Sequence, residues 1–224
     1  MADVLEVQPR SDEEFNDWLN HPDVDNAQPL INEIFGESDR GATLIAVEIL
    51  NGQLEKIIIS KVPEFVASGK KLKDLMNFNG PFGTFSSKIK VAAVNRWLHE
   101  RTYRSIEALR ALRNEAAHSN IKFSLKNHDQ QLDRFLDLGD GAPVHIHNIA
   151  MQTLMEAYVE GLTREGERLS ESIGTNPFDT PEKLQTALKN NPGWPEKLEE
   201  QLPRMKLAIG VYLFLGLLLA ASDR

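Results

Sequence analysis

The chain has 224 residues and contains no cysteine. Without thiols it cannot form disulfides, thiolate metal sites or a cysteine nucleophile, and the absence fits a reducing compartment. The first fifteen residues also lack the basic region and the apolar run of a secretory signal peptide. We therefore expect a cytoplasmic protein.

Common catalytic motifs are missing as well. The sequence has no G-x-S-x-G, no HExxH and no dinucleotide-binding fingerprint, and the GPFG turn at 80–83 lacks the spacing and the lysine of a Walker motif. His145 and His147 would be two metal ligands on one side of an extended segment, but no third ligand has a suitable spacing. We expect neither a cofactor nor a metal.

Charge is unevenly distributed. The net charge is −8, and residues 1–40 hold eleven acids against two bases, so the rest of the chain is almost neutral. Within it, residues 88–113 carry seven bases against two acids. An acidic chain is a poor general duplex binder, but this basic stretch leaves room for a small anion or a few nucleotides. The alternative is a solvated helix face.

Apolar residues recur at helical spacing almost throughout, and alternating runs are scarce. We predict an all-α helical bundle with an acidic appendage at 1–38, packed on a single domain at 39–224. Irregular polar segments are expected at about 120–147 and 173–203. Helices are expected near 11–18, 39–62, 84–99, 103–119, 132–136, 148–168 and 205–222, with one more beginning at Pro181 behind a Thr180 cap.

The C-terminal stretch 207–221 is apolar on every side. Fifteen helical residues rise only about 22 Å, which is shorter than the roughly 20 residues that a bilayer span needs. We expect a core or subunit-interface helix in place of a membrane tail.

One polar constellation could carry chemistry: Arg113, Asn114 and His118, at the end of a predicted helix. Asn114 and His118 are i, i+4 neighbours, so the amide can hydrogen-bond the imidazole. Arg113 and His118 lie about 140° apart around a straight helix, so they meet only if the helix distorts or if a second copy supplies the partner. Together they would suit metal-free chemistry on a phosphodiester, with His118 as acid or base and Arg113 on the phosphate. The alternative is structural, with a helix-end histidine and a salt-bridged arginine.

Glu48 is an acid inside the apolar stretch LIAVEIL. It is either a partly exposed residue at the flank of its helix, or a buried acid that faces Arg113 or His118, because a buried charge needs a partner.

Two stretches, NFNGPFGTFSSKIKVAAVNRWL at 77–98 and YRSIEALRALRNEAAHS at 103–119, resemble the bacterial mannitol-operon repressor (MtlR) family. LIAVEIL fits the same pattern, so the resemblance covers about residues 40–120. It implies an all-α fold and a regulator without a recognised DNA-binding domain, which acts through protein partners. The R-x4-H spacing of Arg113 and His118 is also similar to that of HEPN-superfamily ribonucleases. This second resemblance implies metal-independent cleavage, with Arg and His typically joined at a dimer interface.

Two functions are therefore predicted for a homodimeric protein. The first is an MtlR-like regulator that represses transcription through protein contacts. Direct DNA reading is not expected, because the turn at 101–103 lacks glycine and the next helix does not begin with base-reading residues. The alternative is a HEPN-like, metal-independent ribonuclease or toxin that uses Arg113 and His118 on RNA.

Overall fold

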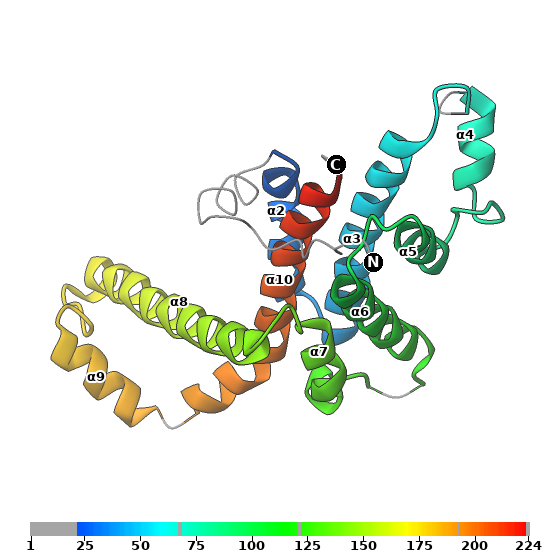
Figure 1. Cartoon of the computed structure of the whole chain (residues 1–224). Coiled ribbons are helices and arrows are strands. Elements are labelled where there is room, and N and C mark those ends of the chain that lie inside the picture. Colours follow the sequence, from blue (N-terminus) through cyan, green and yellow to red (C-terminus); the bar gives the residue numbers. More distant parts are fainter. Residues whose placement is uncertain (1–21, 67–68, 121, 192, 223–224) are drawn as a thin grey trace.

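The computed structural model describes residues 22–66, 69–120, 122–191 and 193–222, and within these ranges all regular structure is helical. The all-α prediction is confirmed (Figure 1). The elements are α2 (Pro22–Gly36), α3 (Asp39–Lys61), α4 (Gly69–Met76), α5 (Phe85–Val94), α6 (Glu100–His118), the 3-10 helix η1 (Leu125–His128), α7 (Asp129–Phe135), α8 (Ala142–Ile173), α9 (Pro181–Asn190) and α10 (Trp194–Ser222).

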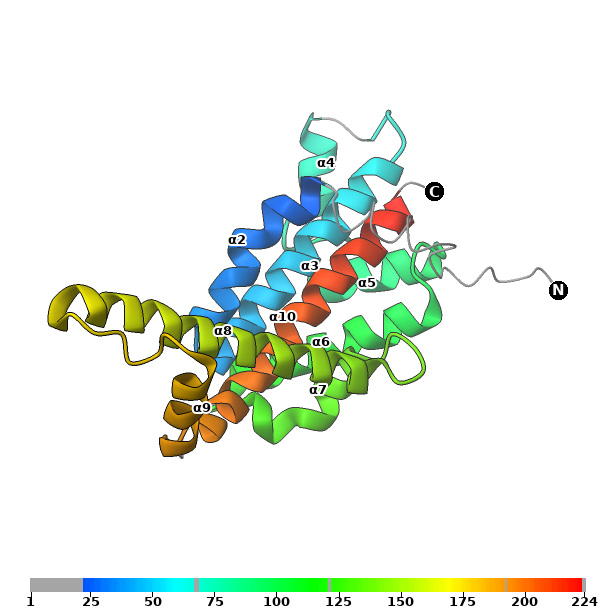
Figure 2. The same cartoon turned by 90° about the vertical axis from the view of Figure 1, so that its left-hand side faces the viewer.

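The apolar C-terminal helix α10 is the centre of the bundle. It packs against α2, α3, α7 and α8, which surround it in both views (Figures 1 and 2). Leu207, Val211 and Leu218 are completely buried, and the Phe214 ring stacks on Phe135 of α7 with 4.8 Å between ring centroids. Burial on all sides explains why this helix is apolar on all sides.

In the described part of the chain, α10 is the one helix long and apolar enough to cross a membrane. However, 67% of its most apolar window is buried inside the protein. Such burial is typical of the core helix of a soluble protein.

α10 begins at Trp194, not near residue 205 as predicted, and it continues through Pro203. Proline removes one helical hydrogen bond and normally kinks or ends a helix. Here Leu198 and Met205, on either side of Pro203, are buried in one cluster with Ala150 and Leu154 of α8. This burial offsets the missing hydrogen bond, so a tertiary contact overrides the local signal.

α2 covers most of the described part of the segment predicted as an N-terminal appendage. It runs through Pro29, and its Ile31 and Ile34 are buried in the same core as α3 and α10. α2 is therefore part of the central packing. The helix predicted at 11–18 lies outside the described residues.

The second predicted helix is shorter than expected. Thr84 caps α5 as its N-terminal signal indicates, but the helix ends at Val94, five residues before the predicted end. Arg96 has a positive φ of 59°, which breaks the helical path, and the His99 side chain then accepts a hydrogen bond from the Arg101 amide to start α6. The turn between these helices is therefore at 95–99, not at 101–103.

The segments predicted as irregular are partly helical. Residues 120–147 contain η1, α7 and the start of α8, while 173–203 contain α9 and the start of α10. His145 and His147 thus lie on a helix, two positions and about 200° apart, not on one side of an extended segment. Burial of Ile146 and Ala150, at helical spacing, accounts for the earlier start of α8. Beyond the bundle, α8 and α9 extend to one side (Figure 1).

Two glycine substitutions test the packing of α10. A Cβ at Gly210 would lie 2.4 Å from Leu136 Cδ2 and 2.7 Å from Phe135 Cε1, whereas a Cβ at Gly52 of α3 meets nothing within 4 Å. Gly210→Ala should lower the free energy of unfolding by about 1–3 kcal/mol through overpacking. Gly52→Ala should raise it by about 0.5–1 kcal/mol through helix propensity. Urea denaturation measures both, and a neutral Gly210→Ala would contradict the contact between α7 and α10.

Candidate functional site

Three of the predicted site residues, Glu48, Arg113 and Asn114, line a groove between α3, α6 and the loop that precedes α5. It encloses about 650 Å³. We call it the Arg113 groove; its lining residues are Leu44, Ile45, Val47, Glu48, Asn51, Phe78, Gly83, Thr84, Phe85, Ser86, Arg110, Arg113 and Asn114.

Arg113 provides the available positive charge of this groove. Its side chain is exposed, and no hydrogen bond or ion pair holds it among the residues that the structure describes. Arg110, one turn earlier, is instead bound by both carboxylate oxygens of Glu107, at 2.7–3.1 Å. The hydrogen bond that Arg110 donates to Glu107 raises the pKa of Arg110 above its ordinary value. The charge of Arg110 is therefore largely satisfied within α6.

Glu48 was predicted either to be partly exposed at the flank of its helix or to be buried and face Arg113 or His118. It lines the same groove as Arg113, from α3. It is exposed, however, and forms no ion pair with Arg113 in the described structure. The burial part of that prediction is wrong, because Glu48 lies on the exposed side of α3 while its neighbours Val47 and Ile49 are buried.

His118 lies outside the groove. α6 remains helical through His118, so the two residues keep the angular separation of about 140° and do not converge within one chain. Asn114 lines the groove, and the described structure contains no hydrogen bond between its amide and His118. The end of α6 is held in place by Arg40, whose guanidinium donates to the Ser119 carbonyl at 2.8 Å.

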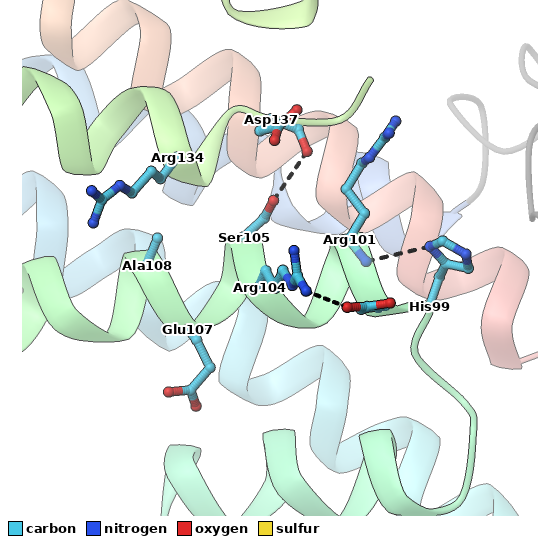
Figure 3. A pocket seen from close by; sticks show the side chains of 9 residues that line it. His99, Arg101, Arg104, Ser105, Glu107, Ala108, Arg134 and Asp137 are labelled. Atoms are coloured by element: carbon cyan, nitrogen blue, oxygen red, sulfur yellow. Dashed lines mark hydrogen bonds and ion pairs between the residues drawn. The ribbon is translucent and has the colours of Figure 1, made fainter. Parts of the chain in front are cut away.

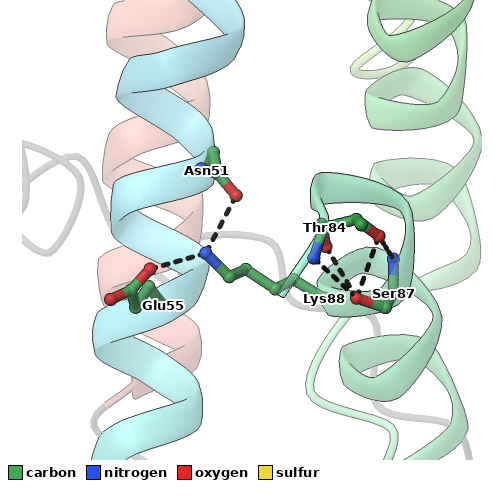
Figure 4. A network of polar contacts seen from close by, with 5 residues as sticks. All are labelled: Asn51, Glu55, Thr84, Ser87 and Lys88. Atoms are coloured by element: carbon green, nitrogen blue, oxygen red, sulfur yellow. Dashed lines mark hydrogen bonds and ion pairs between the residues drawn. The ribbon is translucent and has the colours of Figure 1, made fainter. Parts of the chain in front are cut away.

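A buried lysine holds one wall of the groove (Figure 4). The Lys88 side chain is 3% exposed, and its Nζ donates to Glu55 Oε2 at 2.5 Å and to Asn51 Oδ1 at 3.1 Å. Asn51 therefore uses its carbonyl oxygen on Lys88 while lining the groove. In the sequence Lys88 belongs to the basic stretch at 88–113, and no local pattern marks Asn51 as a site residue. The available signal was the place of Lys88 beside Ile89, on the apolar face of its helix.

The glycines of the GPFG turn serve the turn itself. A Cβ at Gly83 would lie 1.9 Å from the Asn77 carbonyl oxygen, so only glycine permits this approach. At the start of α5, the Thr84 hydroxyl accepts from the Ser87 amide and the Ser87 hydroxyl accepts from the Thr84 amide. These bonds satisfy backbone N–H groups at the start of the helix that have no acceptor within it. The turn and the cap therefore account for the GPFG motif.

The basic stretch at 88–113 does not form one basic surface. Lys88 is buried, and Arg104 and Arg110 pair with acids on their own helix. A second cavity of about 630 Å³, between α6 and α7, combines three arginines with three acids (Figure 3). Its charge is balanced, so it offers no strong field to an anion. The lining comprises His99, Glu100, Arg101, Arg104, Ser105, Glu107, Ala108, Arg134 and Asp137.

Comparisons with protein-family models, curated proteins and solved structures find no significant match to this chain. The resemblance to the MtlR family and the HEPN-like spacing therefore stay predictions.

Removing either partner of the contact between Lys88 and Glu55 should have unequal effects on stability. Glu55→Ala leaves a buried ammonium with Asn51 as its remaining partner in the described structure, and should lower the free energy of unfolding by about 2–4 kcal/mol. Lys88→Met keeps the apolar stem and leaves Glu55, 40% exposed, in contact with water, so it should cost less than about 1 kcal/mol.

The two changes should not add. In the Lys88→Met background, Glu55→Ala should have little effect, because no buried charge is left unpaired. Urea denaturation of the wild type, the two single variants and the double variant completes this double-mutant cycle. Equal and additive effects would show that Lys88 is not buried against α3.

Proposed function

We propose that this chain is a regulatory protein of the MtlR type, which acts in transcriptional repression through protein contacts at the Arg113 groove. One observation carries the proposal. Residues from each of the separate stretches that resemble the family line this groove: Glu48 from α3, Phe78 and Thr84 from the turn, and Arg113 with Asn114 from α6.

The character of the groove supports a protein ligand. Phe78 is 80% exposed and Leu44 is 39% exposed, so large apolar side chains stand at its rim. A polar group held in a defined position, Asn51, lies beside them together with the exposed Arg113. Apolar contact area next to oriented polar groups is typical of protein interaction sites.

Two observations favour protein contacts over direct DNA binding. Three bases of α5 and α6 are engaged, Lys88 in a buried contact and Arg104 and Arg110 in ion pairs on their own helix, which interrupts a continuous phosphate-binding surface. The first turn of α6 begins with Glu100, whose carboxylate pairs with Arg104.

The HEPN-like ribonuclease is the second candidate, and it depends on a homodimer. Arg113 and His118 are both exposed, and within the described structure neither side chain forms a hydrogen bond or an ion pair. A second copy would have to bring its His118 to the Arg113 groove. The separation of these residues within one chain makes this the less favoured function.

In vivo photo-crosslinking tests the regulatory proposal. We expect p-benzoylphenylalanine in place of Phe78 to form a discrete protein adduct in the source cells, because this side chain stands at the groove rim. The same substitution at Phe65, 76% exposed and outside the groove, is the matched control. The adduct should disappear when Arg113→Ala is added. Equal adducts from both positions, or none from Phe78, would reject the groove as the contact surface.

RNA cleavage in EDTA tests the ribonuclease. We expect no cleavage above background from the purified full-length protein, because its acid–base residue lies outside the groove. Arg113→Ala and His118→Ala variants with unchanged circular dichroism serve as controls. Cleavage by the wild type that is lost in both variants would establish the ribonuclease and displace the regulatory proposal.

A further inference from the structure

We infer that the Arg113 groove recognises a protein segment with a single carboxylate next to a large apolar side chain, and that Asn51 is a specificity residue for that carboxylate. This inference rests on the proposed function and names the chemistry of its partner. The juxtaposition that carries it is Arg113 from α6 and Asn51 from α3 on one groove, with exposed Phe78 and Leu44 at the rim.

The amide orientation of Asn51 follows from Lys88. An ammonium group only donates hydrogen bonds, so the Asn51 group that faces it must be the carbonyl oxygen. The contact of 3.1 Å and the burial of Lys88 fix this arrangement (Figure 4). The NH2 group of Asn51 forms no hydrogen bond within the described structure and is not among its buried unpaired atoms, so on this groove-lining residue its two donors are available to a ligand.

Arg113 supplies a positive charge for the same carboxylate of the ligand. Its guanidinium has five N–H donors, and no acceptor holds it in the described structure. Guanidinium and amide donors on two walls of one groove complement a carboxylate, which only accepts.

Glu48 narrows the class of ligand. Its exposed carboxylate lies in the same groove and repels every anion, a chain of phosphates far more than a single carboxylate, and it can accept a hydrogen bond from a peptide N–H beside that carboxylate. Nucleic acids and multiply phosphorylated ligands are therefore disfavoured. The exposed Phe78 and Leu44 side chains account for the apolar neighbour of the carboxylate.

A random peptide library displayed on phage, selected on the immobilised full-length protein, identifies the preferred chemistry. We expect enriched peptides to place one Asp or Glu beside Phe, Leu, Ile or Trp. A synthetic, fluorescein-labelled copy of the most enriched peptide then serves as the probe for affinity measurements by fluorescence anisotropy.

Asn51→Asp is the decisive variant. It keeps an oxygen for Lys88, so the fold is retained, but it replaces the two donors by a negative charge. Affinity for the acidic peptide should fall by about ten-fold or more. A peptide with Gln in place of its acid should bind Asn51→Asp better than the acidic peptide does, which is the reverse of the wild-type order. Loss of folding alone would not reverse this preference.

Further variants separate the possible outcomes. Arg113→Ala should also weaken the acidic peptide, while Arg164→Ala on α8, far from the groove lining, should not. Enriched peptides that bind through Phe78 but lack an acid, or that ignore Asn51→Asp, would overturn this inference and leave the protein-binding function standing. A library without any peptide that depends on the groove would overturn both.

Discussion

The structure depends on the burial of α10. A helix that is apolar on every side must be surrounded, and α2, α3, α7 and α8 surround it. Each large side chain that α10 removes from water contributes about 1.5–3 kcal/mol. The packing of α3 on α10 directs Leu50 and Leu54 inward and leaves Glu48 and Asn51 on the wall of the Arg113 groove. The core helix therefore determines where the candidate site lies, although it contributes no residue to it.

Two buried lysines fix how the packed helices are positioned along one another. Lys206 of α10 donates to Asp129 and Asp133 of α7, at 3.2 and 2.8 Å, and Lys88 of α5 is held in the same way by two residues of α3. In both cases the partners are i, i+4 neighbours on one helix that hold a lysine from another. A shift of either helix would leave a buried charge unpaired, at a cost of several kcal/mol. Apolar contacts thus bring the helices together, and these charges define their relative positions.

Local signals identified the helices well and their ends less well. The stripe of Val47, Leu50 and Leu54 predicted α3 nearly to its last residue, because Pro63 follows it and the helix has a conventional start. The prediction for α5 extended too far, since no local sequence feature predicts the positive φ of Arg96 that ends the helix. The predictions for α8 and α10 were too short, because tertiary contacts bury their first turns: Ile146 of α8 in the central core, and Leu198 of α10 against Ala150 and Leu154 of α8. Those contacts join residues about 50 positions apart, which periodicity within a window cannot detect.

The sequence by itself determined the all-α class, the start of α5 near residue 84 and the apolar character of the last helix, because these follow from composition and from neighbours within four residues. It also indicated Arg113 and Asn114 as candidate site residues. Only the tertiary structure decided that Arg113 shares a groove with Asn51 and that His118 does not. Helical periodicity relates residues of one helix, whereas the meeting of residues from different helices depends on crossing angle and register. Those are set by distant side chains in the core and by the buried lysines.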